Sequence, residues 1–255
     1  MKVQPKRNYE DLASGRVLIS LPGASAFPVR LATDIFVECA RHLDRKRPRG
    51  SFHLYDPTCG CGYMAAVLGF LHADSIRKIS ASDIDVDAVK RAAKNLSLLN
   101  ERGLAERERQ LQQHLAAFGK TSHADALRSV AHIREQFLDR SRLVTVNVFK
   151  ADALDAGAIQ QGLSGEIPDI IFADVPYGRQ SSWRSDQPHS SDAGYTGRLL
   201  SSLSGLDLKD AIVALATPKG ENIEHASFRR IQLVRAPNRK VTLLEQTFCL
   251  SRSRS

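Results

Sequence analysis

Short apolar runs alternate with amphipathic stretches along most of this sequence, and that alternation restricts the fold more than any other feature. Apolar runs of this kind are typical of strands buried on both faces, with helices as the connections. The pattern predicts a doubly wound α/β fold, with a mostly parallel seven-stranded sheet and a C-terminal antiparallel hairpin. The expected strands are residues 52–55, 78–82, 144–149, 169–173, 211–216, 229–235 and 241–250.

The connections carry helical periodicity, and one of them is too long for a single helix. A first helix is expected to start at Pro28, because proline is favoured at a helix start and apolar residues then recur at intervals of four. After the second strand, residues 85–100 are expected to form the crossover helix. Two further helices, at 105–118 and 123–138, are expected on either side of Gly119.

Length and patterning together suggest one catalytic domain with additions. We expect a basic helical extension at residues 1–50 and the catalytic α/β domain at 51–250. A helical insertion is expected at about 101–140 and a disordered tail at 251–255. No apolar run reaches the roughly 18 residues that span a bilayer, and the first residues have no signal-like apolar core. The expectation is a cytoplasmic monomer with no membrane contact.

Four cysteines are too few for a disulfide framework in a chain of 255 residues. Two of them, Cys59 and Cys61, are separated by a single residue, and no His or Cys pair lies nearby in the sequence. Zinc requires more ligands than this. No metal site is expected.

Positive charge gathers at the two ends of the sequence. Residues 1–50 hold ten Lys or Arg against five Asp or Glu, and residues 219–255 hold eight against three, so each end carries +5. The part between them holds 18 basic and 20 acidic residues, which gives −2. Such asymmetry suits an enzyme that binds a polyanion, although a solubilising surface with basic tails would give the same pattern.

A glycine-containing loop, Asp-Pro-Thr-Cys-Gly-Cys-Gly at residues 56–62, follows the first strand and leads into a helical pattern. Glycines at such a junction let the backbone turn tightly and approach a ligand. The acidic first residue favours a sulfonium cofactor with a positive amino group and no phosphate over a dinucleotide. A purely structural turn is the alternative. The candidate cofactor-binding residues here are Asp56, Thr58, Gly60, Cys61 and Gly62.

Two further strands also end in short acidic residues. Asp83 stands at the end of the second strand, where a carboxylate can accept both ribose hydroxyls of an adenosine. Asp85 is better placed to cap the next helix. Asp152 follows the third strand and could accept a hydrogen bond from an adenine amino group. With their neighbours Ile84 and Ala153, Asp83 and Asp152 complete the candidate cofactor site.

The fourth strand runs into Asp174-Val-Pro-Tyr-Gly at residues 174–178. An amino group on an aromatic base is a poor nucleophile, because its lone pair is delocalised into the ring. A carboxylate at Asp174 could accept its hydrogens, Pro176 would stiffen the turn, and Tyr177 could stack on an extruded base. These three residues are the candidate catalytic group, although the sequence would also form an ordinary turn.

The order of these motifs resembles that of the class I amino-methyltransferases, whose fourth motif is usually Asn/Asp-Pro-Pro-Tyr/Phe. The likeness spans residues 51–218 and implies S-adenosyl-L-methionine as cofactor. Val175 departs from it, because most members have proline there. Cys61 stands where serine or threonine is common. Neither change removes a group that the chemistry needs.

A narrower likeness, over nearly the whole chain, is to the avilamycin-resistance methyltransferases of the AviRa type, which methylate a guanine in 23S ribosomal RNA. It implies 23S rRNA or the large ribosomal subunit as partner, and protection against an orthosomycin antibiotic such as avilamycin. Combined with the fourth motif, it favours an exocyclic amino nitrogen of guanine as the target. The segments that carry the likeness are residues 27–36, 56–62, 93–96, 118–120 and 174–178.

Two other functions remain open from the sequence. One is methylation of a different amide or amine, in a protein glutamine, DNA adenine or tRNA guanine, because those reactions use the same fourth motif. The other is a non-catalytic RNA-binding module that keeps the fold.

Arginines and a tryptophan supply the candidate RNA contacts. The loop after residue 178 would leave the sheet beside the catalytic group and interleaves an aromatic side chain with arginines, which suits base stacking and phosphate contact. Surface loops of this composition often bind nothing. The candidates are Arg179, Trp183 and Arg184 in that loop, and Arg7, Arg16 and Arg30 in the basic N-terminal part.

Overall fold

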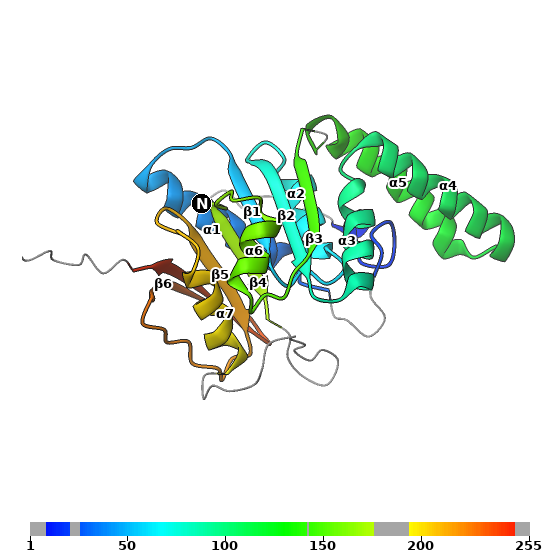
Figure 1. Ribbon diagram of the computed structural model, residues 1–255. Coiled ribbons are helices and arrows are strands. Elements are labelled where there is room, and N and C mark those ends of the chain that lie inside the picture. Colours follow the sequence, from blue (N-terminus) through cyan, green and yellow to red (C-terminus); the bar gives the residue numbers. More distant parts are fainter. Residues whose placement is uncertain (1–8, 21–25, 142, 176–193, 248–255) are drawn as a thin grey trace, which may run out of the picture.

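The computed structural model describes residues 9–20, 26–141, 143–175 and 194–247. Their strands form one seven-stranded sheet in the order β3-β2-β1-β4-β5-β7-β6 (Figure 1). The first five strands run parallel, whereas β7 is antiparallel to both β5 and β6. The predicted fold class is therefore confirmed. The strands are β1 (Phe52–Asp56), β2 (Ile76–Asp83), β3 (Thr145–Lys150), β4 (Ile170–Asp174), β5 (Ile212–Thr217), β6 (Phe228–Arg235) and β7 (Lys240–Gln246).

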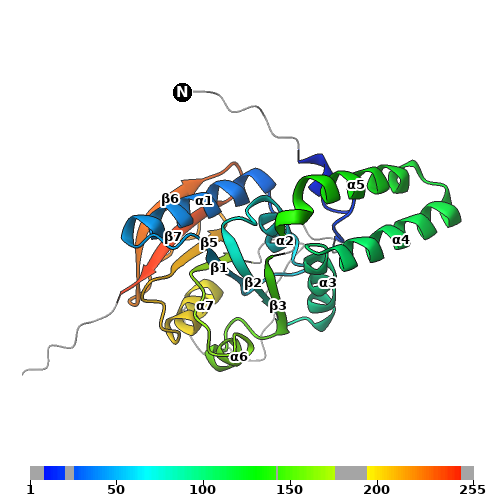
Figure 2. The same ribbon diagram turned by 90° about the horizontal axis from the view of Figure 1, so that it is seen from above.

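Helices cover both faces of the sheet (Figure 2). Side chains of α1, α2 and α3 pack on one face, and those of α6 and α7 pack on the other. Neighbouring residues of β4 show the division, since Phe172 belongs to the first apolar cluster and Ile171 to the second. The helices are α1 (Val29–Lys46), α2 (Tyr63–Leu71), α3 (Val86–Ser97), α4 (Glu101–Phe118), α5 (Thr121–Ser141), α6 (Ala156–Gly162), α7 (Tyr195–Ser204) and the short 3-10 helix η1 (Glu10–Leu12).

The strand order reverses between β1 and β4, which lie side by side although the chain visits β2 and β3 between them. In open α/β sheets, ligands bind outside the carboxyl ends of the strands at such a reversal. The loops after β1 and β4 both leave from this point. The topology therefore places the glycine loop and the fourth motif at the same edge of the sheet.

The helical insertion is a hairpin of α4 and α5 that projects from the body of the molecule (Figures 1 and 2). Gly119 breaks the two helices as predicted, with a φ of +60° that a left-handed turn requires. Near the body, Leu104 and Leu111 of α4 pack with Val130 and Ile133 of α5. Both helices begin earlier than the sequence predicted, and α4 does so because Asn100 caps it by accepting from Gly103 N–H.

Two predicted ends were placed too far along the chain. The helix expected to reach residue 100 ends at Ser97, because Asn100 already serves as the cap of the next helix. The last strand was expected to reach residue 250, whereas β7 ends at Gln246. Its partner strand β6 begins at Phe228, directly opposite Gln246, so a longer β7 would have no strand to pair with.

The division into an extension at 1–50, a domain at 51–250 and a tail at 251–255 stays a prediction, and the tail lies outside the described residues. Helix α1 contributes to the same apolar cluster as the sheet, for example through Ile35 and Phe36. Within the described ranges, no helix has both the length and the apolar character needed to cross a membrane.

Candidate functional site

The glycine loop after β1 makes a turn that only glycine adopts without strain. Gly60 and Gly62 have φ values of +53° and +69°, in the left-handed region. A Cβ on Gly62 would also lie 3.0 Å from the Cα of Ala92 in α3, so glycine lets the loop and that helix approach each other. Gly62 begins α2 without a side-chain cap. The N-cap residue therefore has no side chain that would occupy the first N–H groups of α2.

Asp83, at the end of β2, fixes the shape of this loop. One carboxylate oxygen accepts a hydrogen bond from Gly60 N–H at 2.9 Å, and the other accepts one from Asp85 N–H at 2.9 Å. Burial raises the pKa of Asp83, and the two backbone donors act in the opposite direction. Asp85 caps α3 by accepting from the N–H groups of Asp87 and Ala88, as predicted.

Asp56 is almost fully buried at the start of the loop, with 2% of its surface exposed. It accepts a hydrogen bond from Thr58 N–H at 3.2 Å. Burial raises the pKa of Asp56 well above its ordinary value, and the nearby carboxylates of Asp174 and Asp83 raise it further. The loops after β1, β2 and β4 thus bring three carboxylates together, which places the fourth motif beside the glycine turn.

A direct contact joins the glycine loop to the fourth motif. The hydroxyl of Thr58 donates to the backbone carbonyl of Asp174 at 3.3 Å, and Val175 N–H donates to the carbonyl of Ala216 at the end of β5. The backbone around Asp174 is therefore held from both sides. The proposed chemistry requires the two loops to share one edge of the sheet, and they do.

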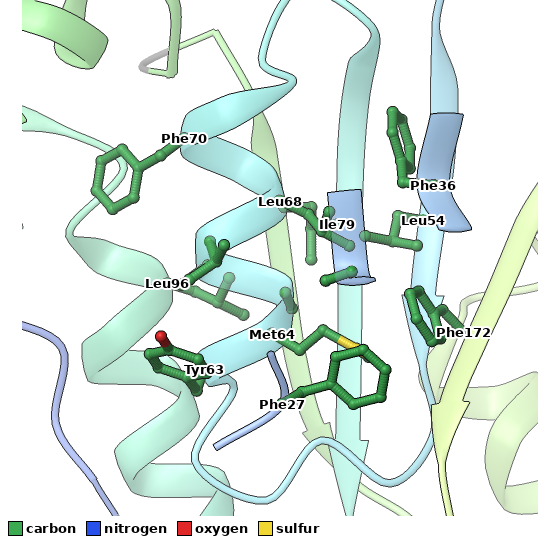
Figure 3. Close-up of a cluster of buried hydrophobic side chains, with 14 of the residues drawn as sticks. Phe27, Phe36, Leu54, Tyr63, Met64, Leu68, Phe70, Ile79, Leu96 and Phe172 are labelled. Atoms are coloured by element: carbon green, nitrogen blue, oxygen red, sulfur yellow. The ribbon is translucent and has the colours of Figure 1, made fainter. Parts of the chain in front are cut away.

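Asp174 carries an ion pair that the sequence analysis missed. Nη1 of Arg239 donates to both of its carboxylate oxygens, at 2.9 and 3.0 Å. The guanidinium also lies over the ring of Phe27, 4.6 Å from the centroid. That ring packs edge-on against Phe172, with the centroids 5.3 Å apart; Figure 3 shows it next to Met64 as well. An arginine between an aromatic ring and a carboxylate has little freedom to move.

The pKa of Asp174 reflects two opposing causes. Burial raises it, while the charge and hydrogen bonds of Arg239 lower it, and the pKa lies at about 6. The sequence predicted a hairpin of strands 229–235 and 241–250, and Arg239 lies in the turn between them. Because the last strand was expected to run antiparallel to its neighbours, that turn could have been assigned to the same edge as Asp174.

A second missed residue is Asn95 of α3, which is fully buried. Its side-chain amide donates to the carbonyls of Ile19 and Cys61, both at 2.8 Å, and its oxygen accepts from Ile19 N–H at 2.7 Å. All of these partners are backbone atoms. Asn95 therefore ties the N-terminal segment to the glycine loop.

Asp152, after β3, lies at the same edge and is buried. Its carboxylate accepts a hydrogen bond from Leu154 N–H at 2.9 Å, and Ala151 N–H donates to the carbonyl of Asp83 at 3.2 Å. The third strand end is thus connected to the second. Ile84 and Ala153 lie beside these acids in the chain, and their part in cofactor binding stays a prediction, as does that of Asp152.

Several predicted site residues lie outside the described residues, including Pro176 and Tyr177 of the catalytic group. Two of the predicted RNA contacts are described. Arg16 is bound within the protein, since it pairs with Glu10 at 2.9 Å and donates to Ser129 at 3.4 Å. Arg30 is exposed in the first turn of α1. The other candidates outside the described residues are Arg7, Arg179, Trp183 and Arg184.

The sheet order, the glycine turn after β1 and the acidic residues at the following strand ends define the Rossmann-like methyltransferase class of fold. A family model described as rRNA methyltransferase AviRa matches residues 3–239. The chain belongs to the AviRa family of rRNA methyltransferases.

One relative is the 23S rRNA (guanine(2535)-N(1))-methyltransferase of Streptomyces viridochromogenes, which is 37% identical over 234 residues. The match covers 92% of this chain and 90% of the relative. Two solved structures of the rRNA methyltransferase aviRa from the same organism match with a TM-score of 0.81, at 34% and 33% identity. Each match covers 94% of this chain and 93% of the other.

The relative's name states the methylated atom as N1 of guanine, which is a ring nitrogen. The sequence analysis expected guanine but favoured an exocyclic nitrogen. The two atoms differ chemically, because a ring N1 carries one hydrogen and an exocyclic amino group carries two. The carboxylate of Asp174 can accept a hydrogen from either.

Proposed function

We propose that this protein transfers a methyl group from S-adenosyl-L-methionine to a guanine of 23S ribosomal RNA, at N1. The observation that carries the proposal is the position of Asp174, whose backbone is bonded to the glycine loop through Thr58 and whose carboxylate is partly accessible, with 27% of the side chain exposed. Membership of the AviRa family and the name of the relative support the substrate.

The residues at this edge fit the cofactor. S-adenosyl-L-methionine, when bound, supplies a methyl group on a positively charged sulfur. Of the carboxylates of Asp56, Asp83 and Asp174, only that of Asp174 has an ion-pair partner among the described residues, Arg239, so acidic groups outnumber cations here and the site suits a cation better than a phosphate. Asp83 uses one hydrogen bond on each oxygen and retains lone pairs for two ribose hydroxyls. We expect Asp152 to accept a hydrogen bond from the adenine amino group.

Asp174 would remove the proton that the reaction must lose. Methylation at N1 forms a bond from nitrogen to carbon, and the bond from carbon to sulfur breaks with its electrons left on sulfur. The N1 proton passes to the carboxylate of Asp174, and from there to water. Arg239 keeps that carboxylate ionised and oriented, since it holds both oxygens from one side. Each oxygen retains a lone pair for the base.

The proposed substrate implies where and why the protein acts. Ribosomal RNA and large ribosomal subunits are cytoplasmic, so we propose cytoplasmic action. Methylation of 23S rRNA by a member of this family would protect the ribosome against an orthosomycin antibiotic such as avilamycin. Growth of a sensitive strain with and without the gene, in the presence of avilamycin, tests that role.

The deciding experiment is labelled methyl transfer to deproteinised 23S rRNA, intact large subunits, DNA, tRNA and a protein containing the relevant glutamine, run in parallel. Nucleoside mass spectrometry of the labelled product then separates N1-methylguanosine from N2-methylguanosine. We expect label in 23S rRNA or large subunits alone, as N1-methylguanosine. Label in N2-methylguanosine would support the exocyclic target. Label in DNA or protein would overturn the substrate, and no transfer with intact RNA binding would favour a non-catalytic module.

A further inference from the structure

The C-terminal hairpin of β6 and β7 carries a concentration of positive charge beside the proposed site. Residues 228–240 contain five Lys or Arg and no Asp or Glu. Two of these cations are neutralised, Arg239 by Asp174 at 2.9 Å and Arg229 by Glu245 at 2.8 Å. The other three are Arg230, Arg235 and Lys240, and none of them pairs with a carboxylate of the described residues.

The register places these three cations on one face of the hairpin. Arg235 lies directly opposite Lys240, and Arg230 lies opposite Leu244. Leu244 belongs to the apolar cluster on the α7 face. Val241, an odd number of residues away in the same strand, belongs to the cluster on the α1 face. Opposed residues of an antiparallel pair point to the same face. Arg230, Arg235 and Lys240 therefore share the α7 face, and Arg230 and Arg235 are exposed there.

This basic face begins at the site and leads away from it. Lys240 pairs with Thr217, the last residue of β5, so the turn of the hairpin lies at the carboxyl edge of the parallel strands. From that turn Arg239 reaches Asp174. Strand β6 is the edge of the sheet, and Arg230 lies roughly 15 Å along it from Arg235 at the usual rise per residue.

The opposition of Arg235 and Lys240 is unfavourable for the folded protein by itself. Like charges directly across an antiparallel pair destabilise it. A polyanion lying along the hairpin would neutralise both cations. Phosphate contacts of this kind supply affinity and orientation without reading sequence.

We infer that the face formed by Arg230, Arg235 and Lys240 binds phosphates of the RNA strand that delivers the target base to Asp174. This inference rests on the proposed function, because it assumes an RNA substrate. An RNA strand bound to this face would run from the carboxylate of Asp174 along the edge strand β6.

The test compares two triple variants with the same loss of charge. One is R230Q/R235Q/K240Q; the control is R45Q/R47Q/K209Q, which removes three exposed cations from the opposite, amino edge of the sheet. Binding to deproteinised 23S rRNA is measured by filter retention at several salt concentrations. We expect the hairpin variant to bind at least about tenfold more weakly than the control. The slope of log binding constant against log salt concentration should become shallower by about 2, for three lost phosphate contacts.

Steady-state kinetics provide a second measurement. KM for the RNA should rise with kcat at saturation unchanged, because these cations position the strand and do not touch the reacting atoms. The single variant R235Q should keep or raise the thermal midpoint while weakening RNA binding, since it removes a like-charge opposition. That combination excludes unfolding as the cause of the binding loss.

The outcomes separate the two proposals. If the wild type methylates RNA but both triple variants bind equally well with the same salt slope, the hairpin surface is wrong and the proposed function stands. If the wild type methylates none of the substrates, the proposed function fails, and the salt-dependent binding still decides whether the hairpin contacts RNA phosphates.

Discussion

The two ends of the parallel strands treat buried carboxylates in opposite ways. At the amino end, Asp169 pairs with both Arg49 and Arg77, the latter at 2.7 Å, and accepts from His53 N–H at 2.7 Å. At the carboxyl end, Asp56, Asp83 and Asp174 lie near one another, and among the described residues only Asp174 of the three pairs with a cation, Arg239. The carboxylate of Asp169 is thus occupied by partners within the protein, and its role is structural. Carboxylates with too few cations are available to bind a positive ligand.

The titratable groups follow the same division. His53, at the amino end, is buried, and its Nε2 lies 2.9 Å from Ser80 Oγ. Burial and the nearby charge of Lys78 lower the pKa of His53 to about 4, so it is neutral at pH 7. At the carboxyl end, burial raises the pKa of Asp174 to about 6, close to the pH at which proton transfer is useful. At pH 7 His53 therefore stays neutral at the amino end, whereas Asp174 at the carboxyl end can gain or lose a proton near that pH.

The largest expected effect is at the carboxyl end. Asp174→Asn keeps the shape of the side chain but removes the proton acceptor, so we expect kcat to fall by about 10³-fold. Affinity for S-adenosyl-L-methionine, measured by calorimetry, should stay within about twofold. An equal loss of both would reassign Asp174 to cofactor binding and weaken the contrast between the two ends.

The matching change at the amino end should act on stability alone. Asp169→Ala leaves Arg49 and Arg77 without this carboxylate, and we expect the free energy of unfolding to fall by about 3 kcal/mol in urea titrations. Because Arg77 is half exposed, water limits the loss. Asp210→Ala is the control; this exposed residue lies 3.7 Å from Arg49 and should cost under about 0.5 kcal/mol. A loss of kcat in folded Asp169→Ala would contradict the division of roles.

A smaller effect is expected for Asp83, the acid at the carboxyl end that we propose binds the ribose of the cofactor. Asp83→Ala removes the acceptor for ribose and the anchor of Gly60, so cofactor affinity should fall by about 10- to 100-fold while kcat at saturation changes little. Asp87→Ala, four residues further on and exposed, is the control and should bind normally. Unchanged cofactor binding in Asp83→Ala would remove it from the site.

The smallest expected effect is on the pH dependence of kcat/KM, and it tests whether the ion pair with Arg239 sets the pKa of Asp174. Asp174 must be ionised to accept a proton, so kcat/KM should fall as the pH drops through about 6. Arg239 lowers that pKa, so Arg239→Gln should move the acid limb of the kcat/KM profile to higher pH, by about one pH unit. Arg239→Lys, which keeps the charge, should restore most of the wild-type profile. An acid limb that does not move would mean that another group titrates.

Local sequence patterns were sufficient for the architecture and for one half of the site. The apolar runs fixed the seven strands, and the residue that follows each strand was readable beside it, as with Asp83 and Asp174. Parallel strands place all their carboxyl ends at one edge, so acids found separately along the chain could be assigned to one place. The cap at Asp85 and the break at Gly119 were readable for the same reason, because each depends on its own few residues.

The other half of the site depends on contacts between distant parts of the chain. Arg239 and Asp174 are 65 residues apart, and Asn95 and Ile19 are 76 apart. No local pattern marks either pair, since an arginine in a turn and an asparagine in a helix are ordinary where they stand. The sequence by itself determined which strands form and which acids end them, because those features follow from residues next to each other. Only the tertiary structure decided which carboxylate pairs with Arg239, because that choice depends on how the hairpin of β6 and β7 folds back against the sheet.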